Sequence, residues 1–68
     1  MKINRAQAIE LARAEVERKD LGWEEPIRVV FGFWNYEVWT KSNCRGGNLI
    51  IEVNRRSGMV TVNGPTPK

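Results

Sequence analysis

The sequence predicts an α+β fold in which one N-terminal helix packs on an antiparallel meander sheet of three or four strands. Residues 5–19 contain no glycine or proline and repeat their apolar side chains at helical spacing. After Pro26 the residue types change to β-branched and aromatic ones in alternation with polar ones, which is typical of strands. Polar segments that contain glycine divide this second half into short pieces.

Length and composition indicate one small folded domain. A chain of 68 residues, 41% hydrophobic and 28% charged, has room for one domain and is too apolar to be disordered. We expect residues 1–63 to form this domain. Residues 64–68 carry two prolines and no apolar side chain, which predicts a flexible C-terminal tail.

The helix is predicted from Arg5 to about Lys19. Asn4 is a suitable N-cap, and Gln7 follows at the capping-box spacing, where each side chain bonds the backbone amide of the other residue. The apolar side of the helix is formed by Ala8, Ile9, Ala12 and Val16. Because two of these four are alanines, the helix should approach its neighbour closely, and a sheet offers the flat surface that this requires.

Strands are predicted at about 27–33, 35–42, 48–54 and 59–63. The turn at 54–58 is strongly indicated, because Gly58 can adopt the positive φ of a type I turn followed by a bulge. Residues 43–47 give a similar signal with two glycines. The break near residues 32–35 is less strongly indicated, and one long, bent strand over residues 27–41 is the alternative.

Strand alternation assigns the two faces of the sheet. The face predicted to pack under the helix carries Ile27, Val29, Phe31, Tyr36, Val38, Leu49, Ile51, Val53, Val60 and Val62. The opposite face carries Arg28, Val30, Glu37, Trp39, Lys41, Ile50, Glu52, Met59 and Thr61. Because a single helix covers only one side of a sheet, four apolar residues of the opposite face should remain uncovered. These are Val30, Trp39, Ile50 and Met59.

Composition also limits the possible chemistry. The chain has no histidine, which excludes a Ser-His-Asp triad, a Cys-His nucleophile and a His-containing zinc site. We therefore expect no enzyme, no metal and no cofactor. Cys44 is the only cysteine, so no internal disulfide can form, and we interpret it as an incidental loop thiol in a cytoplasmic protein. The sequence shows no signal peptide and no segment able to span a membrane.

The arrangement of the helix, the tryptophan-containing strand and the last hairpin resembles a known group of proteins. In the closing hairpin, residues 47–60 read Gly-Asn-Leu-Ile-Ile-Glu-Val-Asn-Arg-Arg-Ser-Gly-Met-Val, and Ala8, Ile9 and Ala12 supply the small helix residues. This pattern over residues 4–63 resembles small bacterial PepSY-like domains and the related YrhB-type toxin-immunity proteins. The resemblance implies a non-catalytic module that inhibits or sequesters another protein, and it implies no catalytic residue.

Two functions follow as hypotheses. The first is a non-enzymatic interaction or immunity-like module whose uncovered face at Val30, Trp39, Ile50 and Met59 binds a partner protein or a second copy of the chain. The second is binding of single-stranded nucleic acid, because aromatic rings stack on unpaired bases and arginines neutralise phosphates. The net charge of +3 and the pI near 9.5 suit a polyanion. Its candidate residues are Trp34, Trp39, Arg45, Arg55 and Arg56.

Two observations weigh against the nucleic-acid hypothesis. The turns at 43–47 and 55–58 should lie at opposite ends of the sheet, which would separate Arg45 from Arg55 and Arg56. The sequence also has no strand motif of alternating aromatic and glycine residues like that of RNA-recognition domains.

Overall fold

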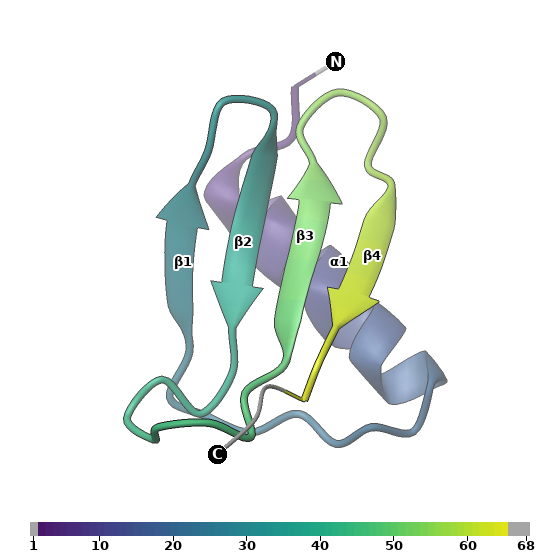
Figure 1. Ribbon diagram of the computed structural model, residues 1–68. Coiled ribbons are helices and arrows are strands. Elements are labelled where there is room, and N and C mark those ends of the chain that lie inside the picture. The colour runs from purple at the N-terminus through teal and green to yellow at the C-terminus, as the bar shows by residue number, and fades with distance from the viewer. Residues whose placement is uncertain (1, 66–68) are drawn as a thin grey trace.

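The fold is a four-stranded antiparallel sheet with one helix across one of its faces (Figure 1). The computed structural model describes residues 2–65. The elements are α1 (Arg5–Arg18), β1 (Arg28–Phe31), β2 (Asn35–Trp39), β3 (Ile50–Asn54) and β4 (Val60–Asn63). The strands lie in the order β1-β2-β3-β4, which confirms the predicted α+β meander. Of the predicted tail 64–68, the last three residues lie outside the described residues.

The helix begins with the predicted capping box. The backbone N–H of Gln7 donates to Oδ1 of Asn4 over 2.8 Å, and the backbone N–H of Asn4 donates to Oε1 of Gln7 over 2.9 Å. These bonds satisfy two amides that a helix start would otherwise leave free. In the last turn Arg18 donates to both carboxylate oxygens of Glu15, which lowers the pKa of that carboxyl.

The core lies between the helix and the sheet. Ala8, Ala12 and Val16 are fully buried, and the helix packs mainly across β2, β3 and β4. The predicted sheet side of this core is buried at Tyr36, Val38, Leu49, Ile51 and Val53, and partly buried at Ile27, Val29, Val60 and Val62.

Phe31 was wrongly predicted to belong to this core, because its side chain is 59% exposed. Strand alternation places it on the helix side of the sheet. It is, however, the last residue of β1, which is an edge strand outside the three strands that the helix mainly covers. Parity assigns a residue to a face of the sheet, but it does not say how far the helix extends over that face.

Residues 27–41 form a hairpin and not one bent strand. The N–H of Gly32 donates to the carbonyl oxygen of Asn35 over 2.8 Å, which closes a tight turn between β1 and β2. A Cβ atom on residue 32 would lie 3.0 Å from that oxygen, which is closer than side chains normally approach backbone. The turn therefore favours glycine at this position, and it ends β1 two residues earlier than predicted.

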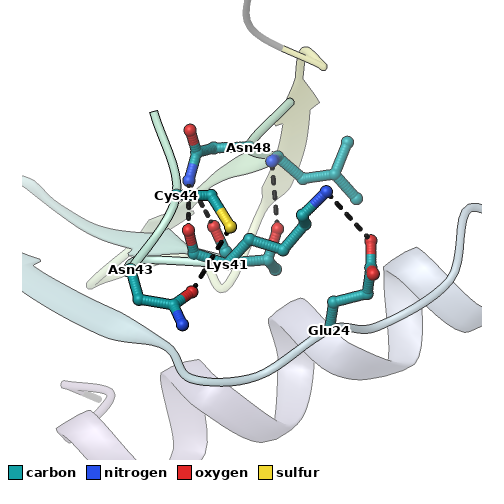
Figure 2. Close-up of polar contacts among 7 residues, drawn as sticks. Glu24, Lys41, Asn43, Cys44 and Asn48 are labelled. Carbon is teal, nitrogen blue, oxygen red and sulfur yellow. Dashed lines mark hydrogen bonds and ion pairs between the residues drawn. The ribbon is translucent and has the colours of Figure 1, made fainter. Parts of the chain in front are cut away.

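The long connection between β2 and β3 is held by buried polar groups (Figure 2). Nδ2 of Asn48 donates to the carbonyl oxygens of Thr40 and Lys41 over 2.7 and 2.8 Å. The N–H of Leu49 donates to Oγ1 of Thr40 over 3.0 Å. Lys41, whose φ of 50° interrupts the strand, places its Nζ 3.9 Å from a carboxylate oxygen of Glu24. These contacts explain why β2 ends at residue 39, short of the predicted residue 42.

Candidate functional site

Two turns lie at the same end of the sheet and bring aromatic and basic side chains together. The β1–β2 and β3–β4 turns lie at the end near the N-terminus, and the β2–β3 connection lies at the other end (Figure 1). The N–H of Arg55 donates to the carbonyl oxygen of Trp34 over 2.8 Å, and this bond joins the two turns. We call the side chains gathered here the aromatic–arginine cluster. Its members are Lys2, Phe31, Phe33, Trp34, Arg55 and Arg56.

The β1–β2 turn projects two aromatic rings from the molecule. Phe33 and Trp34 occupy its two central positions, between Gly32 and Asn35. Neither side chain can reach the core from the tip of such a tight turn, so Phe33 is 84% exposed and Trp34 is 58% exposed. The ring centroids are 5.7 Å apart and the ring planes are inclined by 44°. The rings thus form two adjacent platforms that face different directions.

Arg55 connects the parts of the cluster. Its guanidinium carbon lies 4.5 Å from the centre of the Phe31 ring, and its Nη1 donates to the carbonyl oxygen of Phe33 over 3.2 Å. Its own carbonyl oxygen accepts from the N–H of Ile3 over 2.8 Å. The Nε atom is buried and has no hydrogen-bond partner among the described residues. Arg55 therefore brings an uncompensated positive charge into the cluster while it holds the turn in place.

Arg56 and Lys2 add two further positive charges. The guanidinium carbon of Arg56 lies 5.5 Å from the centre of the Trp34 ring, within the range of a cation–π contact. Both side chains belong to exposed residues. Together with Gly32, the cluster lines a shallow pocket of about 470 Å³, which is a size typical of ligand sites. Among the described residues, none that lines this pocket is acidic.

The chemistry available in this pocket is stacking and charge neutralisation. The pocket presents aromatic faces and three cationic side chains, and the residues that line it carry no carboxylate, hydroxyl or thiol that could act as acid, base or nucleophile within the described part of the chain. Such a site suits a ligand that combines flat rings with negative charge.

The structure separates the residues predicted for nucleic-acid binding. It brings Trp34, Arg55 and Arg56 together in the cluster. Arg45 lies in the β2–β3 connection at the opposite end of the sheet, and Trp39 lies on the uncovered sheet face. A single ligand at the cluster would contact neither of these two residues, so the five candidates do not form one site.

Sequence reasoning missed Lys2, Phe31 and Phe33 as site residues. The signal for Phe33 was present in Gly32-Phe33-Trp34-Asn35, because a tight turn there necessarily exposes both central rings. Phe31 was assigned to the core by parity, and Lys2 reaches the pocket because the Ile3–Arg55 backbone bond brings the N-terminal segment beside the β3–β4 turn.

The uncovered sheet face carries polar side chains between its apolar ones, as strand alternation predicts. Trp39 and Ile50 are direct cross-strand neighbours and both are half-buried. Val30 lies opposite Glu37, which in turn lies opposite Glu52. Met59 lies next to the β3–β4 turn, where its carbonyl oxygen accepts the N–H of Asn54 over 2.9 Å, and it lines a small hollow together with Glu52.

The two glutamates of this face have neutral hydrogen-bond donors. Nε1 of Trp39 donates to Glu37 over 3.3 Å, and Nδ2 of Asn63 donates to Glu52 over 3.3 Å. Within residues 2–65 neither glutamate forms an ion pair. A pair of carboxylates therefore lies among the apolar residues of this face.

The other features considered as sites are the lone cysteine, metal-binding clusters and membrane-spanning helices. Cys44 is exposed in the β2–β3 connection, with its Sγ 3.5 Å from Oδ1 of Asn43 (Figure 2). Residues 2–65 contain no group of three or more His, Cys, Asp or Glu side chains placed to bind a metal ion. In the same part of the chain no helix is both long and apolar enough to cross a membrane.

Comparisons of the chain with models of protein families, with curated proteins and with solved structures find no match. The resemblance to PepSY-like and YrhB-type proteins therefore stays a prediction. The geometry of the molecule itself has to carry any functional proposal.

Proposed function

We propose that this protein is a non-enzymatic module that binds single-stranded nucleic acid at the aromatic–arginine cluster. The observation that carries the proposal is the pairing of two projecting rings, Phe33 and Trp34, with three cationic side chains around one pocket that has no acidic lining residue among those described. Unpaired bases offer flat faces for the rings, and the phosphates that join them offer negative charge for the cations.

The geometry favours an unpaired strand over a duplex. The two rings stand at the tip of a turn, and their planes are inclined by 44°, so they can stack on bases that are free to turn toward them. In a duplex the base faces are already stacked on one another, and only the grooves and the backbone are accessible. A module with this site would therefore discriminate against double-stranded nucleic acid by the loss of stacking.

The first prediction concerns the two rings. Phe33→Ala and Trp34→Ala should each weaken binding of a fluorescent oligothymidylate by about 1–3 kcal/mol, roughly 5- to 150-fold, because each removes one stacking platform. Anisotropy titrations at low salt would measure the affinities, and a duplex of equal length would test the preference for single strands. Trp39→Ala, on the uncovered sheet face, is the matched control and should bind like the wild type.

Three results would contradict this proposal. The wild type could fail to bind single strands at low salt. The Trp39→Ala variant could lose as much affinity as Trp34→Ala. Exposed aromatic residues beside cations also occur on proteins that bind anionic membrane surfaces, so retention on anionic lipid vesicles without binding of the oligonucleotide would assign the cluster to a membrane surface instead.

A second candidate function is protein binding at the uncovered sheet face. It is favoured by Trp39 and Ile50, which are direct cross-strand neighbours. Both alternate with the buried pair Val38 and Ile51, so they lie on the sheet face away from the helix. Glu37 and Glu52 beside them form no ion pair within residues 2–65, which favours a partner that carries basic side chains between apolar ones. A second copy of the chain fits less well, since stacking the same face on itself would bring four carboxylates together. The immunity-like role implied by the resemblance would use this face.

The second prediction tests this face. A random peptide library selected against the wild type should yield sequences with Lys or Arg next to large apolar residues, and Trp39→Ala should lose these peptides while its unfolding midpoint changes little. Sedimentation of the purified chain should give the mass of a monomer. Selection of acidic peptides, or equal binding to Trp39→Ala, would contradict the candidate.

A further inference from the structure

The two arginines of the cluster are held in different ways. Arg55 is fixed by the bond from its Nη1 to Phe33, by its stacking on Phe31 and by two backbone hydrogen bonds. The side chain of Arg56 has no hydrogen bond or ion pair within residues 2–65. Its contact is with the face of Trp34, at 5.5 Å. Arg56 is thus an exposed side chain whose contact is with the Trp34 ring, whereas Arg55 is held by hydrogen bonds to the turn residues.

The resting position of Arg56 coincides with the place where a base would stack. The guanidinium of Arg56 covers one face of Trp34, and a base that stacks on this face needs the same ring surface. Exposed side chains exchange rotamers within nanoseconds, and a cation–π contact at an exposed site is weak. A guanidinium bonds a phosphate with two parallel N–H donors, which is a stronger contact than the one it would give up.

Resting on the proposed function, we propose that Arg56 is a displaceable phosphate ligand of the nucleic-acid site. In the free protein its guanidinium covers Trp34. When a single strand binds, a base replaces the guanidinium on the ring, and Arg56 turns to the phosphate that adjoins this base. Arg55 keeps its place and holds the turn that presents the rings. Arg56 therefore shields Trp34 in the free state and contributes charge in the bound state.

The third prediction, which tests this proposal, concerns the salt dependence of binding. For single strands, log affinity falls with log salt concentration by about 0.7 for each phosphate neutralised. Arg56→Gln should therefore reduce the steepness of this line by about 0.7, so that over a tenfold rise in salt the variant loses about fivefold less affinity than the wild type. Arg56→Lys keeps the charge without the planar group and should keep the slope of the wild type. The probe is a short oligothymidylate.

Arg45→Gln provides the matched control. It removes the same charge from an exposed residue at the opposite end of the sheet, so it should leave the slope unchanged. Residue 56 is also exposed and contributes to the turn through its backbone N–H, which bonds Oδ1 of Asn54, so substitution of its side chain should leave the fold intact. Circular dichroism of each variant would verify this.

The outcomes separate the inference from the proposed function. If Phe33→Ala loses binding while Arg56→Gln keeps the slope of the wild type, the site binds nucleic acid but Arg56 does not contact a phosphate, and the inference is wrong. If the salt slope of Arg56→Lys falls as much as that of Arg56→Gln, the planar group of Arg56 is used for stacking, and displacement does not occur. If the wild type does not bind the oligonucleotide, the proposed function fails and the inference fails with it.

Discussion

Thr40 shows how a single buried hydroxyl group organises one end of this molecule. Its Oγ1 accepts the N–H of Leu49, and its carbonyl oxygen accepts a bond from the side chain of Asn48. Thr40 and Asn48 are the buried polar residues of the described chain, and the hydrogen bond between them helps to close the β2–β3 connection. A buried N–H without a hydrogen-bond partner destabilises the fold, so residue 40 has to supply an acceptor for the N–H of Leu49.

Replacement of this hydroxyl group gives the fourth prediction. Thr40→Val keeps the shape of the side chain but leaves the N–H of Leu49 buried without an acceptor, which should lower the free energy of unfolding by about 1–3 kcal/mol. Thr61→Val makes the same chemical change on the exposed surface of β4 and should alter stability by no more than about 0.5 kcal/mol. Urea denaturation of both variants would measure the difference. Equal stabilities would show that the bond to Thr40 contributes nothing.

At the scale of elements, local signals that act within a few residues predicted the helix and the strand faces well. The capping box at Asn4 and Gln7 and the apolar side at Ala8, Ala12 and Val16 are both found as expected. Parity also predicted the buried strand residues, because a side chain in a strand has only two faces to choose from. The last hairpin was predicted by its turn, where Gly58 adopts a φ of 74°.

The β1–β2 turn and the cluster beside it were harder to predict. No residue of this turn has a positive φ, so the turn lacks the usual glycine signal. Gly32 is favoured for a different reason, because a side chain there would come too close to the Asn35 carbonyl oxygen. A bent strand therefore stayed open as an alternative to the hairpin. The partners of Trp34 also come from distant parts of the chain, because Arg55 follows it by 21 positions. Only the strand order places these residues at one end.

At the scale of the whole molecule, the buried polar groups and the projecting rings lie at different ends of the sheet. A chain of 68 residues buries a small core, and a domain of this size has little stability to spare. The exposed rings of Phe33 and Trp34 lie outside that core, whereas the Phe31 ring contacts the core residue Tyr36 edge to face, with the ring centroids 5.1 Å apart. The polar groups that close the β2–β3 connection lie at the far end of β2, roughly 17 Å away for a strand of five residues.

This separation gives the fifth prediction, which concerns additivity. Phe33→Ala should weaken nucleic-acid binding and change the free energy of unfolding by no more than about 0.5 kcal/mol, because that side chain is 84% exposed. Thr40→Val should have the opposite profile, with lower stability and an affinity equal to that of the wild type at a temperature where both are folded. The double variant should show the sum of the single effects within about 0.5 kcal/mol, since the two sites share no contact. Urea denaturation and oligonucleotide titration of the four proteins would measure both quantities. A loss of affinity in folded Thr40→Val would mean that the two ends are coupled through the sheet, and the cluster would then depend on the β2–β3 connection for its shape.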